Sequence, residues 1–134
     1  MKMYIVAYLA TLIVFVAIDF LWLSNMANRL YRPTLGDTLT PDFRLVPAVA
    51  FYLIYAAGLT FLAVRTGLMS GSSATAALYG AIVGFTAYAT YDLTNQSTLK
   101  NWSATLTIVD VMWGTVLSAA SAGIGSWITL QIDG

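Results

Sequence analysis

Three aspartates lie within or at the edge of apolar stretches that are long enough to cross a membrane. They are Asp19 in AIDFLWL, Asp92 in ATYDLTN and Asp110 in TIVDVMWG. A charged side chain at the centre of a membrane helix costs roughly 2.5 to 3.5 kcal/mol on insertion scales, and such residues commonly mark sites for protons, ions or polar ligands. The three carboxyl groups therefore predict binding or acid–base chemistry inside the bilayer.

Side chains that can hydrogen-bond a carboxylate recur at helical spacing around these aspartates. Tyr88, Asp92 and Asn95 stand at i, i+4 and i+7, which places them on one face of a helix. A tryptophan follows both Asp19 and Asp110 by three residues. The candidate ligand-binding residues are Asp19, Trp22, Tyr52, Tyr55, Tyr88, Tyr91, Asp92, Asn95, Asp110 and Trp113.

The composition narrows the chemistry that this chain can perform. Its 134 residues include no cysteine and no histidine, so the chain cannot supply a bis-histidine haem, a thiolate cluster, a typical zinc site or a Ser–His or Cys–His nucleophile pair. We therefore expect no cofactor and no metal, and acid–base work would fall to Asp, Tyr or Lys. The formal net charge of zero argues against nucleic acid as a partner.

The elements that position these residues are helical. Hydrophobic residues make up 59% of the chain and charged residues only 9%, which is typical of a protein that lives in the lipid bilayer. Apolar stretches of about 20 residues predict an all-α fold, a polytopic membrane protein built as an up-down bundle of four transmembrane helices. We expect one domain, 1–134, with spans at 3–23, 46–64, 74–94 and 103–128, and a long polar loop at 24–45.

Local signals place the helix ends. Pro47 suits the first turn of the second helix, and Gly67 together with residues 71–73 marks a tight connection to the third. Asn101 or Ser103 is expected to cap the fourth helix. The long loop should lie over one face of the bundle, as a solvated connector or as an ordered lid.

An up-down arrangement brings the three aspartates toward the same membrane face. Asp19 and Asp92 lie near the ends of their helices and Asp110 near the start of its own. Counted from the helix ends, Asp92 should lie near the headgroups, Asp19 about 6 Å in and Asp110 about 10 Å in. This face carries four of the six Lys and Arg residues, so the positive-inside rule predicts that it is cytoplasmic.

Each conspicuous residue also has a structural explanation. Asp92 would be an interfacial charge near Lys100, Asp19 would pair with an arginine of the long loop, and a protonated Asp110 would only join helices. Aromatic residues near the helix ends would anchor the protein at the membrane interfaces. These are Tyr4, Tyr8, Trp22, Tyr31, Trp102 and Trp127.

Small residues at four-residue spacing predict close helix packing. Gly80 and Gly84 form one such face, and Gly114 and Ser118 begin another. Faces of this kind let backbones approach closely within a chain or between chains. We expect them to serve the bundle, a homo-oligomer or a larger membrane complex.

Several strings together resemble the family catalogued as domain of unknown function 2177, a group of bacterial integral membrane proteins. The strings are AIDFLWL, the stretch from Tyr31 to Gly36, FYLIYAAGL, YATYDLTNQSTLKNW and VDVMWG. The resemblance extends over nearly the whole length of the chain. The resemblance implies a four-helix, multi-pass protein of the bacterial inner membrane. It brings no established activity and no catalytic residue.

Three functions compete on this basis. The first is a bundle that binds or translocates a proton, a cation or a polar or lipid headgroup at the aspartates. The second is an accessory subunit that docks onto a larger membrane complex. The third is a membrane enzyme acting on a lipid or isoprenoid, with an aspartate pair as acid and base. Three same-side carboxyl groups among tyrosines favour the first.

Overall fold

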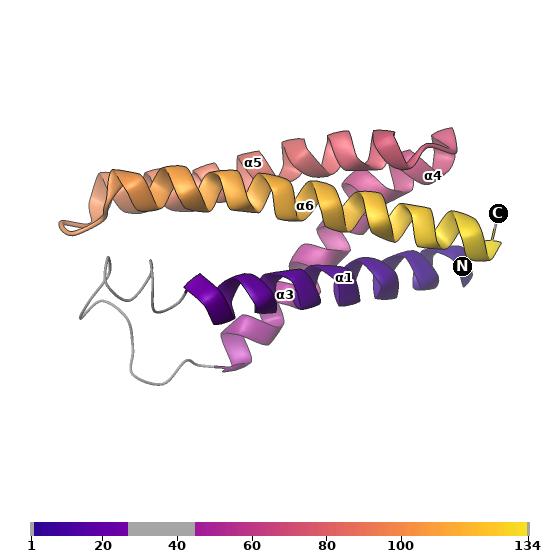
Figure 1. Cartoon of the computed structure of the whole chain (residues 1–134), viewed down its shortest axis with the longest axis horizontal. Helices are drawn as coiled ribbons and strands as arrows, with labels where there is room; N and C mark the ends of the chain where they lie inside the picture. Colours follow the sequence, from indigo (N-terminus) through magenta and orange to yellow (C-terminus); the bar gives the residue numbers. More distant parts are fainter. Residues whose placement is uncertain (1, 27–44, 134) are drawn as a thin grey trace.

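The computed structural model of this chain describes residues 2–26 and 45–133. The described part is helical and its consecutive long helices alternate in direction (Figure 1). Both chain ends lie at the same end of the bundle, as an even number of crossings requires. The long loop was predicted at 24–45, but residues 24–26 belong to the first helix and Leu45 begins the second. The other predictions for this loop, which include the lid, the Tyr31 anchor and the arginine partner of Asp19, lie outside the described residues.

Four helical stretches confirm the all-α bundle, and each contains most or all of one predicted span. They are α1 (Lys2–Met26), the continuous run of α3 (Leu45–Leu59), η3 (Thr60–Val64) and α4 (Arg65–Ser70), α5 (Ser73–Thr98) and α6 (Ala104–Asp133). Within the second run, η3 is a π-helical turn, and the hydroxyl of Thr60 donates to the carbonyl of Ala56 at 2.7 Å. A turn of this kind relaxes the backbone pattern and often lies near functional positions.

Most helix ends follow the predicted signals, but Gly67, which was predicted to mark a connection, lies inside α4. Pro47 lies in the first turn of α3. Gly71 ends α4 in the left-handed conformation with a φ of 69°, which favours glycine. Ser72 then caps α5, because its hydroxyl accepts a hydrogen bond from the Thr75 amide. At the start of α6 the cap is Ser103, whose hydroxyl accepts from the Leu106 amide at 3.3 Å.

The outward surface is apolar, as a bilayer requires. Three helical stretches are long and apolar enough to cross a membrane: Lys2–Met26, Leu45–Ser70 and Ala104–Ile132. Large side chains such as Ile13 and Phe20 are 65% and 67% exposed on the outer face of α1. Helix α5 has sufficient length but more polar residues, so its predicted span at 74–94 stays a prediction.

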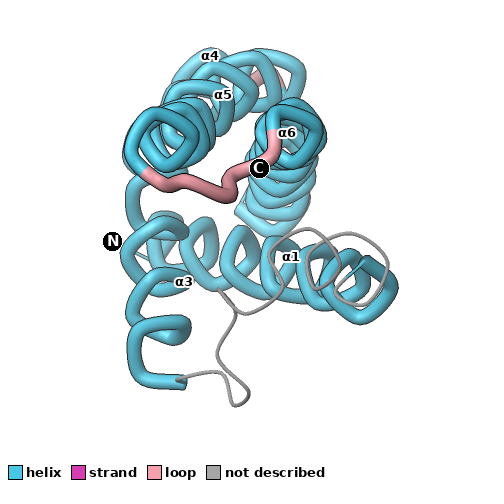
Figure 2. The backbone as a smooth tube through the Cα atoms, turned by 90° about the vertical axis from the view of Figure 1, so that its left-hand side faces the viewer, coloured by secondary structure: helices cyan, strands magenta, loops and turns pink. Residues whose placement is uncertain are grey.

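The most extensive helix contact joins α5 and α6, which lie side by side in both views (Figures 1 and 2). A Cβ added at Gly84 would lie 2.5 Å from the carbonyl oxygen of Gly114 and 2.5 Å from the hydroxyl of Ser118. The two small-residue faces therefore meet each other inside the chain. Both faces are buried within the chain, as expected if they serve the bundle, and a role for them in an oligomer or a larger complex stays a prediction.

Candidate functional site

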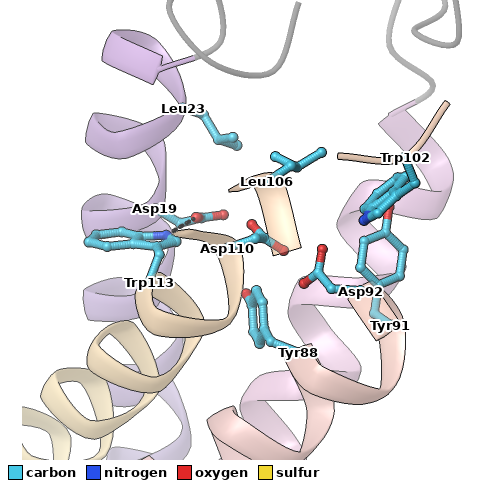
Figure 3. Close-up of a pocket in the computed structure, with 9 residues that line it drawn as sticks. All are labelled: Asp19, Leu23, Tyr88, Tyr91, Asp92, Trp102, Leu106, Asp110 and Trp113. Carbon is cyan, nitrogen blue, oxygen red and sulfur yellow. Dashed lines mark hydrogen bonds between the residues drawn. The ribbon is translucent and has the colours of Figure 1, made fainter. Parts of the chain in front are cut away.

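The three aspartates converge in one cavity of about 180 Å³ near the end of the bundle where α5 connects to α6 (Figure 3). Asp19 comes from α1, Asp92 from α5 and Asp110 from α6. The cavity is lined by Asp19, Leu23, Tyr88, Tyr91, Asp92, Trp102, Leu106, Asp110 and Trp113. The predicted convergence of the carboxyl groups is therefore present in the structure.

Asp19 is held by two hydrogen bonds from other helices. The hydroxyl of Tyr52 donates to its Oδ2 at 2.7 Å, and the indole N–H of Trp113 donates to its Oδ1 at 3.2 Å. The ring of Trp113 stacks on Trp22 with the centroids 4.2 Å apart and the planes at 9°. Since each carboxylate oxygen has a donor, Asp19 is a satisfied and oriented acceptor.

Asp92 lacks the hydrogen-bond donors that Asp19 has. Its side chain is 0% exposed, and its two buried carboxyl oxygens have no hydrogen-bond partner among the described residues other than the carboxyl group of Asp110. Its carboxyl group faces that of Asp110, close enough for the charge of one to act on the other (Figure 3). Burying a charged carboxylate without donors costs free energy, so the Asp92–Asp110 pair favours the binding of a proton or a cation.

Burial shows how the three carboxyl groups lie within the bundle. Asp92 is 0% exposed and Asp19 and Asp110 are each 8% exposed. Lys100 is exposed, so Asp92 is not a surface charge beside it. The expected depths in the membrane stay predictions. Helix α5 continues to Thr98 and does not end at residue 94, so Asp92 lies almost two turns inside the helix.

Tyrosines connect the cavity to the bundle core. The hydroxyl end of Tyr88 points toward Asp110 (Figure 3), and its ring contacts that of Tyr55 edge to face at 6.2 Å. The Tyr55 hydroxyl is hydrogen-bonded to Ser118 Oγ at 2.7 Å. The ring of Tyr88 can lie here because residue 114 is glycine. A Cβ at Gly114 would lie 2.1 Å from that ring.

A second cavity of about 310 Å³ adjoins the first and shares Tyr88, Tyr91 and Asp110 with it. Its remaining lining residues, Phe51, Tyr55 and Ala87, give it an apolar character. Asp110 therefore stands between a polar compartment and an apolar one. An amphiphilic group could place its charged end in the first and its carbon chain in the second.

The other predicted residues divide between the cavity wall and its support. Tyr91 lines both cavities and Tyr55 lines the second. Tyr52 and Trp22 support the wall from behind, since Tyr52 donates to Asp19 and Trp22 stacks on Trp113. Asn95 is half-buried one turn beyond Tyr91 and lines none of the cavities formed by described residues. Its side chain is hydrogen-bonded to Tyr91, so it supports the cavity wall from behind.

Sequence reasoning missed three lining residues, Leu23, Trp102 and Leu106. Trp102 was expected to be an interface anchor, but its ring lines the cavity and contacts Tyr91 edge to face at 5.9 Å. Its indole N–H donates to Thr107 Oγ1 at 2.9 Å. The available signal was its position in the short α5–α6 connection, directly above the carboxyl groups of both helices.

The donor set does not suit a multidentate metal ion. Within residues 2–26 and 45–133, no group of three Asp, Glu, His or Cys side chains is arranged to hold one. Two facing carboxyl groups are instead suited to a shared proton or a single cationic group.

The orientation of Asp19 can be tested through Tyr52. We expect Tyr52→Phe to lower the stability of the folded protein by about 1 to 2 kcal/mol, because it removes a charge-assisted hydrogen bond. Unfolding in detergent, followed by circular dichroism, measures the loss. Tyr79→Phe is the control, since Tyr79 is 43% exposed, and it should change little. Equal stability of both variants would show that the Tyr52 bond does not hold Asp19.

Fold and cavity together define a helical membrane bundle with three carboxyl groups gathered near one end. Residues 4–127 match the family described as "Predicted membrane protein (DUF2177)". The chain belongs to this family, as the sequence strings predicted. No match was found among curated proteins or among solved structures.

Proposed function

We propose that this protein binds a proton or a small cationic group between Asp92 and Asp110, with Asp19 as a fixed neighbouring charge. The carrying observation is that both carboxyl oxygens of Asp92 are buried and have no partner among the described residues other than the facing carboxyl group of Asp110. Two facing carboxylates cannot both stay ionised in such a place without a proton or a cation between them. The ligand would therefore supply the proton or positive charge that no helix provides to Asp92.

The contrast with Asp19 supports this assignment. A carboxylate that only joined helices would resemble Asp19, whose two oxygens accept bonds from Tyr52 and Trp113. The bundle therefore contains donors that satisfy a buried carboxylate, yet none of them reaches Asp92. Buried polar groups in native proteins are almost always satisfied, so this exception calls for a ligand.

We place the cavity at the cytoplasmic face of a bacterial inner membrane, in a multi-pass topology. The support is the family resemblance and the excess of Lys and Arg on the loop side, of which Arg29, Arg32 and Arg44 lie outside the described residues. A cysteine introduced at exposed Lys100 should react with an impermeant thiol reagent only after the membrane is opened. Labelling from outside the cell would reverse the orientation.

Infrared difference spectroscopy tests the shared proton. The carbonyl stretch of a protonated carboxyl group should be present in the wild-type protein at neutral pH and absent in Asp92→Asn. Asn has nearly the same shape as Asp and cannot ionise, so the fold should persist. The control is Asp19→Asn, which leaves the Asp92–Asp110 pair intact and should retain the band.

Two outcomes would count against the proposal. A band that persists in Asp92→Asn would show that the proton resides elsewhere. A wild-type protein without the band, and with no stabilisation by added sodium, potassium or methylammonium ions, would show that the pair holds neither a proton nor a cation.

A further inference from the structure

Hydroxyl side chains continue from the carboxyl cavity along the buried face of α6. Ser118, Ser121, Ser126 and Thr129 are each 0% exposed. Thr11 of α1 joins them, since a Cβ added at Gly125 would lie 2.3 Å from its Oγ1. We call these five residues the core hydroxyls. They are buried, and on α6 they run from Ser118, which is bonded to Tyr55, toward the C-terminal end of the helix. This end of α6 lies beside the N-terminal end of α1 (Figure 1).

The cavity and the core hydroxyls are linked by tyrosines. Tyr88 directs its hydroxyl end toward Asp110 and packs against Tyr55 (Figure 3). Tyr55 is hydrogen-bonded to Ser118 at 2.7 Å, and either oxygen can be the donor. A bond that can run in both directions is what a proton relay requires.

The core hydroxyls differ from the hydroxyls that face lipid. On the outer face of α5, an exposed threonine recurs every fourth residue, and each hydroxyl donates to the carbonyl four residues earlier. These are Thr86, Thr90, Thr94 and Thr98. Lipid offers no partners, so such internal satisfaction is expected there.

In the core, three hydroxyls have no partner among the described residues: Thr11 Oγ1, Ser121 Oγ and Ser126 Oγ. Close packing alone does not explain them, because alanine would allow the same helix approach without an unsatisfied polar group. Thr129, by contrast, donates to the Gly125 carbonyl at 2.8 Å. The three open hydroxyls therefore retain hydrogen-bonding capacity for water or for a proton in transit.

We infer that the core hydroxyls form a proton path across the bundle, from the Asp92–Asp110 pair to the opposite membrane face. This inference rests on the proposed proton site. Thr129 lies nineteen residues beyond Asp110 on α6, a rise of about 28 Å, close to the roughly 30 Å of a bilayer's hydrocarbon core. The path is thus long enough to connect both faces.

Transfer along this path leaves the side chains unchanged. Each hydroxyl oxygen accepts a proton from one neighbour and releases its own proton to the next, and water molecules bonded to the open hydroxyls bridge the intervals. One proton enters at one face and one leaves at the other, down its electrochemical gradient. The carboxyl pair holds the proton at the cavity end.

Proton flux into liposomes tests the path. The protein is reconstituted with a pH-sensitive dye inside, and a potassium gradient with valinomycin drives the flux. Removing a relay hydroxyl adds a barrier of about one hydrogen bond, so Ser121→Ala/Ser126→Ala should reduce the flux about tenfold or more. The matched control is Thr90→Ala, which deletes a lipid-facing hydroxyl and should leave the flux unchanged.

The outcomes separate this inference from the proposed site. Wild-type flux no greater than that of protein-free liposomes would overturn the path, and so would equal flux in the double variant. Either result would leave the infrared band of the carboxyl pair as an independent test of the proton site. The double variant should keep that band, and the single variants Ser121→Ala and Ser126→Ala, each with a smaller loss of flux, decide the question if the double variant does not fold.

Discussion

Gly84→Ala should separate α5 from α6 and destabilise the folded bundle. The added Cβ would lie 2.5 Å from the carbonyl oxygen of Gly114 and 2.6 Å from the Cβ of Ser118. A backbone oxygen cannot rotate away as the end of a long side chain can, so the two helices must move apart. Overpacking of this kind costs about 3 kcal/mol. Alanine's better helix propensity offsets only about 1 kcal/mol of it.

The consequence for the site follows from the same contact. Asp92 and Asp110 face each other because α5 and α6 lie closely side by side, so separation of the helices should also weaken the carboxyl pair. Unfolding in detergent measures the loss of stability, and the infrared band of the protonated carboxyl group measures the loss of pairing.

Gly58→Ala is the matched control. Gly58 lies inside α3, and a Cβ added there meets nothing within 4 Å. Since no contact opposes the substitution, the helix-propensity gain of up to about 1 kcal/mol should remain. The same change is therefore expected to destabilise at one position and to stabilise slightly at the other. Similar effects at both positions would show that the α5–α6 contact does not limit stability.

The sequence was sufficient to predict the helices and the side of the bundle on which the aspartates gather. Apolar stretches of bilayer length predict four helices, and alternating direction places Asp19, Asp92 and Asp110 at one end. These inferences depend only on helix length and chain direction, which single-sequence patterns report well.

The burial of Asp92 within the bundle could not be predicted in the same way. The polar residues after position 94, among them Asn95 and Gln96, indicated that the span had ended, but α5 continues through them to Thr98. Polar residues end the apolar part of a helix without ending the helix itself. Trp102 of the connection and Leu106 of α6 line the same cavity as Asp92, and no spacing rule relates them to α5.

The open core hydroxyls and the π-helical turn were likewise beyond sequence reasoning. Ser118 belongs to a recognised small-residue face, but Ser121 and Ser126 resemble any serine of a membrane helix until their hydroxyl partners are known. Whether a serine donates to its own helix is decided by its rotamer and neighbours. The π-helical turn at Thr60–Val64 has no distinctive residue pattern.

Two isosteric substitutions should change stability in opposite directions, Asp92→Asn upward and Asp19→Asn downward. Asp92 has two buried oxygens without donors. Asparagine removes the charge and offers an N–H toward Asp110, so we expect a gain of about 1 to 3 kcal/mol, the cost of an unsatisfied buried group. The gain should grow as the pH rises, because the wild type needs a proton between its carboxyl groups and the variant does not.

Asp19→Asn should cost about 1 to 3 kcal/mol, since it weakens the charge-assisted hydrogen bond from Tyr52 and turns an amide donor toward another donor. Chemical unfolding in detergent at two pH values measures both variants. A stabilised Asp92→Asn protein that has also lost its proton flux would identify Asp92 as a residue kept for function at the expense of stability. Destabilisation by Asp92→Asn would instead make Asp92 a helix-joining residue like Asp19.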